Sequence, residues 1–354
     1  MSHSTLLGLP NMRFPTFAAL ALSSLALVAC GSDSDTDEPA SGGEATTEEA
    51  AFPATIEHKY GSTTVKAAPK RVVVAGLREQ DALLALGVVP VATTEWYGKQ
   101  AGAIFPWAKD ELGDEEIETV LSSTDGLQIE KIAAQRPDLI VAIYSGMTKK
   151  EYTTLSKIAP VIAQPKGEPD YGSSWQEETL ISGKAVGKPE QAQELVDETE
   201  DLVEETAEKH PDFKGQQAAV VSDYQGIFVY GPDDVRSRLL VELGFEYPPA
   251  LTKAFPDEFG GQLSEEQTDA LDVGTLVWFT DAGAGGEAAV KRKPAYRDLA
   301  VRKEGRDVFV AEKDRVYDAT SFVSVLSMPT LMEELVPRLA AAADGNPKTS
   351  TAQE

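Results

Sequence analysis

The chain is short of cysteine, histidine and basic residues. Its 354 residues include one cysteine, which excludes an internal disulfide and a zinc site built on two or more thiolates. Of the three histidines, His3 lies in the signal expected at the N-terminus, His58 before the first predicted strand and His210 at the end of the predicted spine, so no imidazole cluster is expected. A bare Zn²⁺ or Mn²⁺ site is therefore disfavoured, as is general acid–base chemistry based on histidine.

Positive charge is also scarce. Lysine and arginine total 32 against 58 aspartates and glutamates, a net charge of −26. Such a chain is a poor candidate for binding a nucleic-acid backbone, which needs a basic face. The composition, with 42% hydrophobic and 25% charged residues, is that of a globular protein. We find no Gly-x-Ser-x-Gly, His-Glu-x-x-His or P-loop motif, and so we do not expect an enzyme.

The first thirty residues have the pattern of a secretory signal. Arg13 is the only Lys or Arg before residue 53, and it precedes an apolar run over residues 14–29. The run is shorter than the roughly 20 apolar residues of a membrane span. It ends in Leu-Val-Ala-Cys, which resembles the bacterial lipobox and implies lipidation of Cys30. We expect residues 1–29 to be a lipoprotein signal peptide, with translation starting at Met1 or Met12.

Residues 30–52 follow as an acidic tether. Between residues 31 and 51 there are seven acids and no base, a composition that cannot bury enough apolar surface to fold. Removing residues 1–52 leaves 31 bases against 51 acids, a net charge of −20. The acidity therefore belongs to the body as well as to the tether.

The body alternates predicted strands with predicted helices, which is typical of an α/β fold. In the first half we expect strands at 71–75, 88–92, 138–142 and 160–163, and helices at 81–86, 129–135 and 151–158. In the second half we expect strands at 218–221, 227–230, 275–279 and 308–310, and helices at 235–243, 263–271, 294–299 and 329–342. Trp278 lies inside a strand pattern and is expected in the core.

A long helical segment separates the two halves. We predict one helix from Trp175 to residue 186 and a second that begins at Pro189, carries one apolar stripe and stops at residues 210–211. The predicted organisation is an N-terminal α/β lobe at 53–174, a spine at 175–211, a C-terminal α/β lobe at 212–343 and a flexible tail at 344–354. Leu-rich helix ends before Gly87 and Gly244 give a faint internal repeat.

Several stretches resemble the periplasmic-type solute-binding proteins of ABC importers for iron–siderophore complexes, haem and cobalamin. They are Pro-Lys-Arg-Val-Val-Val at 69–74, the segment at 80–91, Ile-Glu-Lys-Ile followed by Arg-Pro-Asp-Leu-Ile within 129–140, and residues 175–204. The resemblance covers roughly residues 54–341. It implies two Rossmann-like lobes joined by a single long spine helix, with the ligand in the cleft between them and only small hinge motions. With the lipobox, it implies a monomer anchored by lipid to the extracellular face of a Gram-positive cytoplasmic membrane.

We expect the ligand to be a ferric siderophore, whose organic shell suits aromatic faces and cationic donors. Ligands of open α/β sheets lie at the carboxyl ends of the strands, so we looked for such residues in the loops that follow strands and beside the spine. The candidates are Arg78, Trp96, Tyr97, Tyr144, Tyr171, Trp175, Tyr224, Arg236 and Arg238. The arginines favour an anionic complex, whereas the net charge of the body opposes one. Haem and cobalamin remain alternative ligands, and a purely structural surface lipoprotein is a further alternative.

The resemblance also implies how the protein docks on its permease. In the family, one acidic residue on the outer face of each lobe pairs with arginines of the permease dimer. The matching positions are Asp81, which departs from the usual Glu and has Glu79 beside it, and Glu246.

Overall fold

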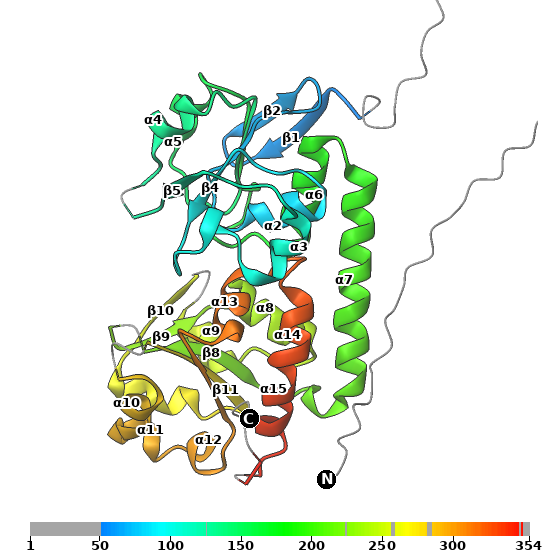
Figure 1. Cartoon of the computed structure of the whole chain (residues 1–354). Helices are drawn as coiled ribbons and strands as arrows, with labels where there is room; N and C mark the ends of the chain where they lie inside the picture. Colours follow the sequence, from blue (N-terminus) through cyan, green and yellow to red (C-terminus); the bar gives the residue numbers. More distant parts are fainter. Residues whose placement is uncertain are drawn as a thin grey trace, which may run out of the picture. The chain divides into compact units, whose positions relative to one another are not determined.

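The computed structural model describes residues 51–124, 126–223, 225–255, 259–281, 285–346 and 348–349. They belong to one compact unit that spans Ala45–Glu354 and contains two five-stranded sheets with helices (Figure 1). The predicted α/β fold is therefore confirmed. The signal peptide, Cys30 and nearly all of the predicted tether lie outside the described residues. Within the described ranges, no helix combines the length and the hydropathy needed to cross a membrane.

The N-lobe sheet has the strand order β5-β4-β3-β6-β7, and all of its pairings are parallel. Its strands are β3 (Val72–Val74), β4 (Ala92–Glu95), β5 (Thr119–Ser122), β6 (Leu139–Ala142) and β7 (Val161–Ala163). Val73 lies in the central strand, pairs with Ala92 and Ile140 on either side, and is fully buried. The short apolar runs form strands here because both faces of the sheet are covered. All five carboxyl ends meet at one edge.

A hairpin and short helices complete the N-lobe. The hairpin consists of β1 (Ala54–His58) and β2 (Gly61–Val65). We did not predict it, although the residues of β1 alternate between buried and exposed in the pattern of a half-buried strand. The helices are α2 (Glu79–Ala85), α3 (Lys109–Leu112), α4 (Ile129–Ala134) and α5 (Lys149–Leu155), with the 3₁₀ helices η1 (Ala101–Ala103) and η2 (Pro106–Ala108).

Two packed helices form the spine (Figure 1). Ser174 caps α6 (Trp175–Val186) by accepting from the backbone nitrogen of Glu177, and α7 (Pro189–Lys209) has Pro189 at its first position, as predicted. Gly183 lets the helices approach, because a Cβ there would lie 2.2 Å from that of Ala192. Helix α7 contacts α6 and also α8 and α14 of the C-lobe, so it joins the two lobes.

The C-lobe sheet has the order β10-β9-β8-β11-β12. Its strands are β8 (Ala218–Ser222), β9 (Ile227–Tyr230), β10 (Gly260–Leu263), β11 (Thr275–Thr280) and β12 (Asp307–Ala311). Strands β8, β11 and β12 are parallel, whereas β9 and β10 are added in antiparallel pairings. Trp278 is fully buried in β11, as predicted.

Helices surround the C-lobe sheet. They are η3 (Pro211–Phe213), α8 (Val235–Glu242), α9 (Pro249–Ala254), η4 (Glu265–Leu271), α10 (Gly286–Arg292), α11 (Pro294–Arg297), α12 (Ala300–Lys303), α13 (Arg315–Phe322), α14 (Met328–Glu334) and α15 (Val336–Ala343). The single closing helix predicted at 329–342 is wrong, because the chain forms two helices with Pro337 in the first turn of the second. The strand predicted at 88–92 is also displaced, since β4 begins only at Ala92.

One apolar cluster is shared by both lobes. It includes Leu84 and Trp107 of the N-lobe, Trp175 of the spine, and Phe322 and Leu331 of the C-lobe. The lobes therefore meet through a dry, packed region as well as through the spine.

Candidate ligand-binding site

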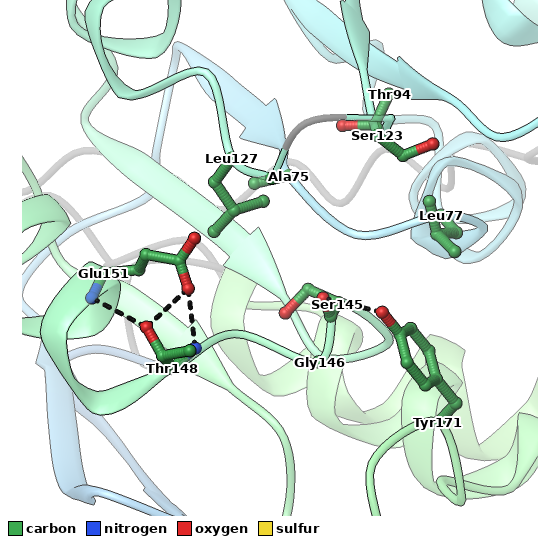
Figure 2. A pocket seen from close by; sticks show the side chains of 11 residues that line it. Ala75, Leu77, Thr94, Ser123, Leu127, Ser145, Gly146, Thr148, Glu151 and Tyr171 are labelled. Atoms are coloured by element: carbon green, nitrogen blue, oxygen red, sulfur yellow. Dashed lines mark hydrogen bonds between the residues drawn. The ribbon is translucent and has the colours of Figure 1, made fainter.

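A pocket of about 240 Å³ lies at the carboxyl edge of the N-lobe sheet, and we call it the N-lobe pocket (Figure 2). Its wall follows the ends of neighbouring strands, because parallel strands bring their carboxyl ends together. Its lining consists of Ala75, Leu77, Thr94, Ser123, Gly126, Leu127, Ser145, Gly146, Thr148, Glu151 and Tyr171. Hydroxyl groups therefore dominate its polar surface.

Glu151 is the one charged residue in the lining of the N-lobe pocket. Its carboxylate accepts hydrogen bonds from the Thr148 backbone nitrogen at 2.8 Å and from Thr148 Oγ1 at 2.6 Å. Partial burial acts to raise the pKa of Glu151, but these hydrogen bonds outweigh it and lower the pKa. The pocket therefore carries a fixed negative charge at neutral pH.

A second pocket, of about 310 Å³, lies at the carboxyl ends of the parallel strands of the C-lobe, and we call it the C-lobe pocket. Its lining consists of Ser222, Asp223, Phe228, Tyr230, Phe259, Phe279, Asp281, Glu312 and Tyr317. Five of these residues are aromatic and three are acidic. This pocket therefore combines flat apolar faces with negative charge.

The acidic groups of the C-lobe pocket influence one another. Asp223 Oδ1 accepts from the backbone nitrogen of Asp281 at 3.2 Å. Burial raises the pKa of Asp223, and the nearby charge of Asp281 adds to that effect. Burial likewise raises the pKa of Asp318 to about 6, with further contributions from the charges of Asp314 and Glu312. Negative potential is therefore concentrated on this side of the cleft.

Aromatic contacts connect the two pockets. Tyr171, which lines the N-lobe pocket, lies 6.3 Å from Phe259 of the C-lobe pocket, measured between ring centres. Tyr97 lies 6.0 Å from Tyr317 by the same measure. Each pocket is lined by one lobe alone, and the Tyr171–Phe259 contact links them; we refer to the two pockets together as the interlobe cleft. Tyr171 is the one predicted ligand residue among those that line these two pockets.

Beneath the cleft, polar groups tie the lobes together in what we call the interlobe junction. Its members are Arg78, Asp81, Tyr97 and Trp107 of the N-lobe, Glu178 of the spine, and Asp318, Phe322, Val323 and Ser324 of the C-lobe. Val323 ends α13 in the left-handed region, with φ 43°. A β-branched residue there is strained by about 1–3 kcal/mol and persists only where its surroundings hold it.

Arg78, predicted as a ligand residue, belongs to this junction. It is 0% exposed, and its guanidinium donates to Glu178 at 2.9 Å, to the carbonyls of Ser173 and Phe322, and more weakly to that of Val323. Every guanidinium nitrogen is therefore engaged by the protein. The structure therefore engages this guanidinium inside the fold, and a contact with the ligand stays a prediction for this residue.

Asp81 is also buried, which contradicts its predicted role in docking. Its exposure is 0%, and one carboxylate oxygen accepts from Trp107 Nε1 and from Ser324 Oγ. Glu79, the alternative, is equally buried and accepts from the Tyr144 backbone nitrogen. Neither carboxylate reaches a surface that a permease could contact. Glu246 is exposed, as its predicted role requires.

The other two predicted arginines are paired as well. Arg236 is 4% exposed, bonds both carboxylate oxygens of Asp234, and lies 4.4 Å from the ring centre of Tyr230. Arg238 is half-buried and pairs across the lobes with Glu168 at 3.1 Å. These cations lie beside or beneath the cleft with carboxylate partners.

The remaining predicted residues are mostly structural. Tyr144 is buried under the Arg78 guanidinium, and Trp175 is buried with its Nε1 donating to Glu242. Trp96 and Tyr97 are half-buried and pack against Phe322. Tyr224 lies outside the described residues.

Sequence reasoning missed most of the C-lobe pocket. Asp223 directly follows β8, and Asp281 directly follows β11. Residues that follow parallel strands are expected near the ligand whatever their charge. Both acids could therefore have been predicted, but a siderophore was expected to need aromatic and cationic contacts only. In the described ranges, no group of three or more His, Cys, Asp or Glu residues could hold a metal ion.

Known solute-binding proteins resemble this chain in sequence and in structure. The chain is 28% identical over 259 residues to the putative ABC transporter substrate-binding lipoprotein YhfQ of Bacillus subtilis, covering 71% of this chain and 78% of that one. A periplasmic solute-binding protein from Mycobacterium smegmatis is 33% identical, with a TM-score of 0.71 over 82% of this chain and 98% of that one. PiaA of Streptococcus pneumoniae, solved in complex with ferrichrome, is 26% identical, with a TM-score of 0.71 over 83% and 99%.

The family assignment rests on a further match. The model of the periplasmic binding protein family matches residues 72–313, from the first strand of the N-lobe sheet to just beyond the last strand of the C-lobe sheet. Proteins of this kind are solute-binding components of importers rather than enzymes. The fold, the cleft and the sequence agree, and the chain therefore belongs to the periplasmic binding protein family.

Proposed function

We propose that this protein captures a ferric siderophore in the interlobe cleft and delivers it to an ABC importer. The observation that carries the proposal is the pair of pockets at the carboxyl ends of the two sheets, joined by the Tyr171–Phe259 contact. A siderophore already saturates its iron, so the protein needs aromatic and hydrogen-bonding surface rather than metal ligands. The likeness to a protein solved with ferrichrome supports the same conclusion.

Binding is tested by tryptophan fluorescence of the purified chain. Trp96 is half-buried and packs on Tyr144 and Phe322 near the cleft, which makes it a suitable reporter. Ferric siderophores, free Fe³⁺, haemin and cobalamin are titrated separately. We expect saturable quenching by a ferric siderophore and none by free Fe³⁺. A response to haemin or cobalamin alone would move the ligand to that class, and no response to any of them would contradict the proposal.

We also propose that Cys30 anchors the protein by lipid outside the cell and that Glu246 contacts the permease. Glu246 is exposed at the end of the C-lobe sheet, where Gln217 forms a bridge with it. Cys30→Ala is expected to release the protein from the membrane fraction. Glu246→Ala is expected to leave the ligand Kd unchanged and to reduce iron uptake by cells. A loss of ligand binding in Glu246→Ala would contradict a docking role.

A further inference from the structure

We propose that the interlobe cleft selects ferric siderophores whose iron complex is neutral or positively charged, the hydroxamate class, and discriminates against anionic catecholate and carboxylate complexes. This inference rests on the proposed function. It agrees with the net negative charge of the body and not with the loop arginines, the two opposing indications that the sequence gives.

The walls of the cleft carry negative charge. The C-lobe pocket is lined by Asp223, Asp281 and Glu312, and the N-lobe pocket by Glu151. Neither set of described lining residues contains a lysine or an arginine. An anionic complex seated against these walls would meet four carboxylates and no basic residue among those that line the two pockets.

The arginines near the cleft are already paired with carboxylates of the protein. Arg78 is held by Glu178, Arg236 by Asp234, and Arg238 by Glu168. The first two pairs are almost completely buried. An anionic ligand would have to displace a carboxylate from such a pair and leave that carboxylate buried without a partner, which is strongly unfavourable. The predicted anion receptors are therefore not available in this arrangement.

The C-lobe pocket offers aromatic surface to a ligand. Phe228, Tyr230, Phe279 and Tyr317 present aromatic rings, and Tyr230 already holds the Arg236 guanidinium against its ring. Aromatic faces bind hydrocarbon chains and attract cations. Asp223 and Asp281 lie close together, since Asp223 Oδ1 accepts from the backbone nitrogen of Asp281 at 3.2 Å, and Glu312 lines the same pocket. A further anion placed beside these carboxylates would be repelled, whereas a cation would be attracted.

The chemistry of iron chelators then defines the class. Three hydroxamates, each singly negative, balance Fe³⁺ and give a neutral complex, and a free amine on the chelator makes it positive. Three catecholates, each doubly negative, leave a trianion, and ferric citrate complexes are also anionic. The cleft described here fits the first group.

The test measures Kd by fluorescence quenching of the full chain in detergent at neutral pH. The probes are ferrioxamine B (cationic), ferrichrome (neutral), ferric citrate and ferric enterobactin (both anionic). We expect the first two to bind at least about tenfold more tightly than the anionic pair. Tighter binding of an anionic complex would overturn this inference and leave the proposed function standing. Binding of none of the four would overturn both.

Variants then show whether the carboxylates cause the discrimination. Asp223→Asn combined with Glu312→Gln is expected to improve the affinity for the anionic probes by about threefold to tenfold relative to the affinity for ferrichrome. Glu265→Gln combined with Glu266→Gln, which line a different pocket of the C-lobe, is the matched control and should change neither. Unchanged discrimination in the first double variant would overturn the assignment. If that variant fails to fold, salt provides the test, because added NaCl must narrow the difference between the cationic and anionic probes in the unmodified protein.

Discussion

The interlobe junction and the C-lobe pocket contain similar residues but use them differently. In the junction, the charge of Arg78 is compensated by Glu178, and Asp81 accepts two hydrogen bonds. In the pocket, Asp223 and Glu312 line open space beside aromatic rings and have no basic neighbour in the lining. The contrast indicates that the junction holds the lobes together whereas the pocket is available to a ligand. Variants in the two regions should therefore separate stability from binding.

The largest effect is expected for Arg78→Ala. The change leaves Glu178 and Glu79 buried without a cation and removes the hydrogen bonds that hold the strained Val323 turn. We expect the free energy of unfolding, measured by urea denaturation, to fall by about 3–5 kcal/mol. Arg238→Ala, whose ion pairs are partly exposed, is the control and should cost less than about 1 kcal/mol. Equal losses in the two variants would remove the distinction between buried and exposed pairs.

The second largest effect is expected in the pH dependence of the free energy of unfolding, through Asp81. Burial raises the pKa of Asp81 to about 6, although hydrogen bonds from Ser324 and Trp107 oppose the shift. The folded state thus holds the proton more tightly than the unfolded chain, so the stabilisation is complete below the unfolded pKa and is lost as the pH rises to about 6.

Urea denaturation across this range measures the effect. Between pH 4 and about 6.5, Asp81 should account for a decline of about 1–3 kcal/mol in the free energy of unfolding. Asp81→Asn should remove this part of the decline, and the exposed Asp212→Asn should not. An identical slope in Asp81→Asn and the unmodified protein would show that other groups control the junction at acid pH.

In the C-lobe pocket, Tyr317→Ala should weaken binding of the siderophore by about tenfold, equivalent to about 1.4 kcal/mol. The ring of Tyr317 packs between Phe279 and Tyr97 and forms part of the cleft wall. Tyr317→Phe keeps the ring and should bind like the unmodified protein. Fluorescence titration gives both values. A loss of stability in Tyr317→Ala with no change in Kd would show that this side chain holds the fold together, as the junction residues do, and does not bind the ligand.

The smallest effect is expected in the N-lobe pocket. Ser145 Oγ donates to the Ala142 carbonyl at 2.8 Å and accepts from the Met147 backbone nitrogen, so the protein already uses much of its hydrogen-bonding capacity. Ser145→Ala should therefore change Kd by less than about threefold. A tenfold loss would show that the ligand depends on the hydroxyl-lined side as much as on the aromatic side.

Sequence patterns predicted the fold better than the site, for a physical reason. A strand buried on both faces needs consecutive apolar residues, as at 72–74, and a helix buried on one face needs an apolar stripe, as in α7. Both patterns lie within one short segment and can therefore be recognised in the sequence. The hairpin of β1 was missed, although its alternation was visible in the sequence. Helix α10 begins at two consecutive glycines, which carry little helical signal.

The role of an arginine, by contrast, depends on partners far away in the chain. Arg78 meets the carbonyl of Phe322, which lies 244 residues later, and Glu178, which lies 100 residues later. Its position after a strand was a valid reason to expect it near the cleft. Whether it faced a ligand or the other lobe was decided by packing that no local pattern contains.

The apolar cluster shared by both lobes has a consequence for heat denaturation. Because Trp107, Trp175 and Phe322 belong to one continuous core, neither lobe can melt without exposing apolar surface of the other. A scanning calorimeter should therefore record one endotherm for the folded body, even though the chain has two separate sheets. In thermodynamic terms, two architectural lobes form a single cooperative unit.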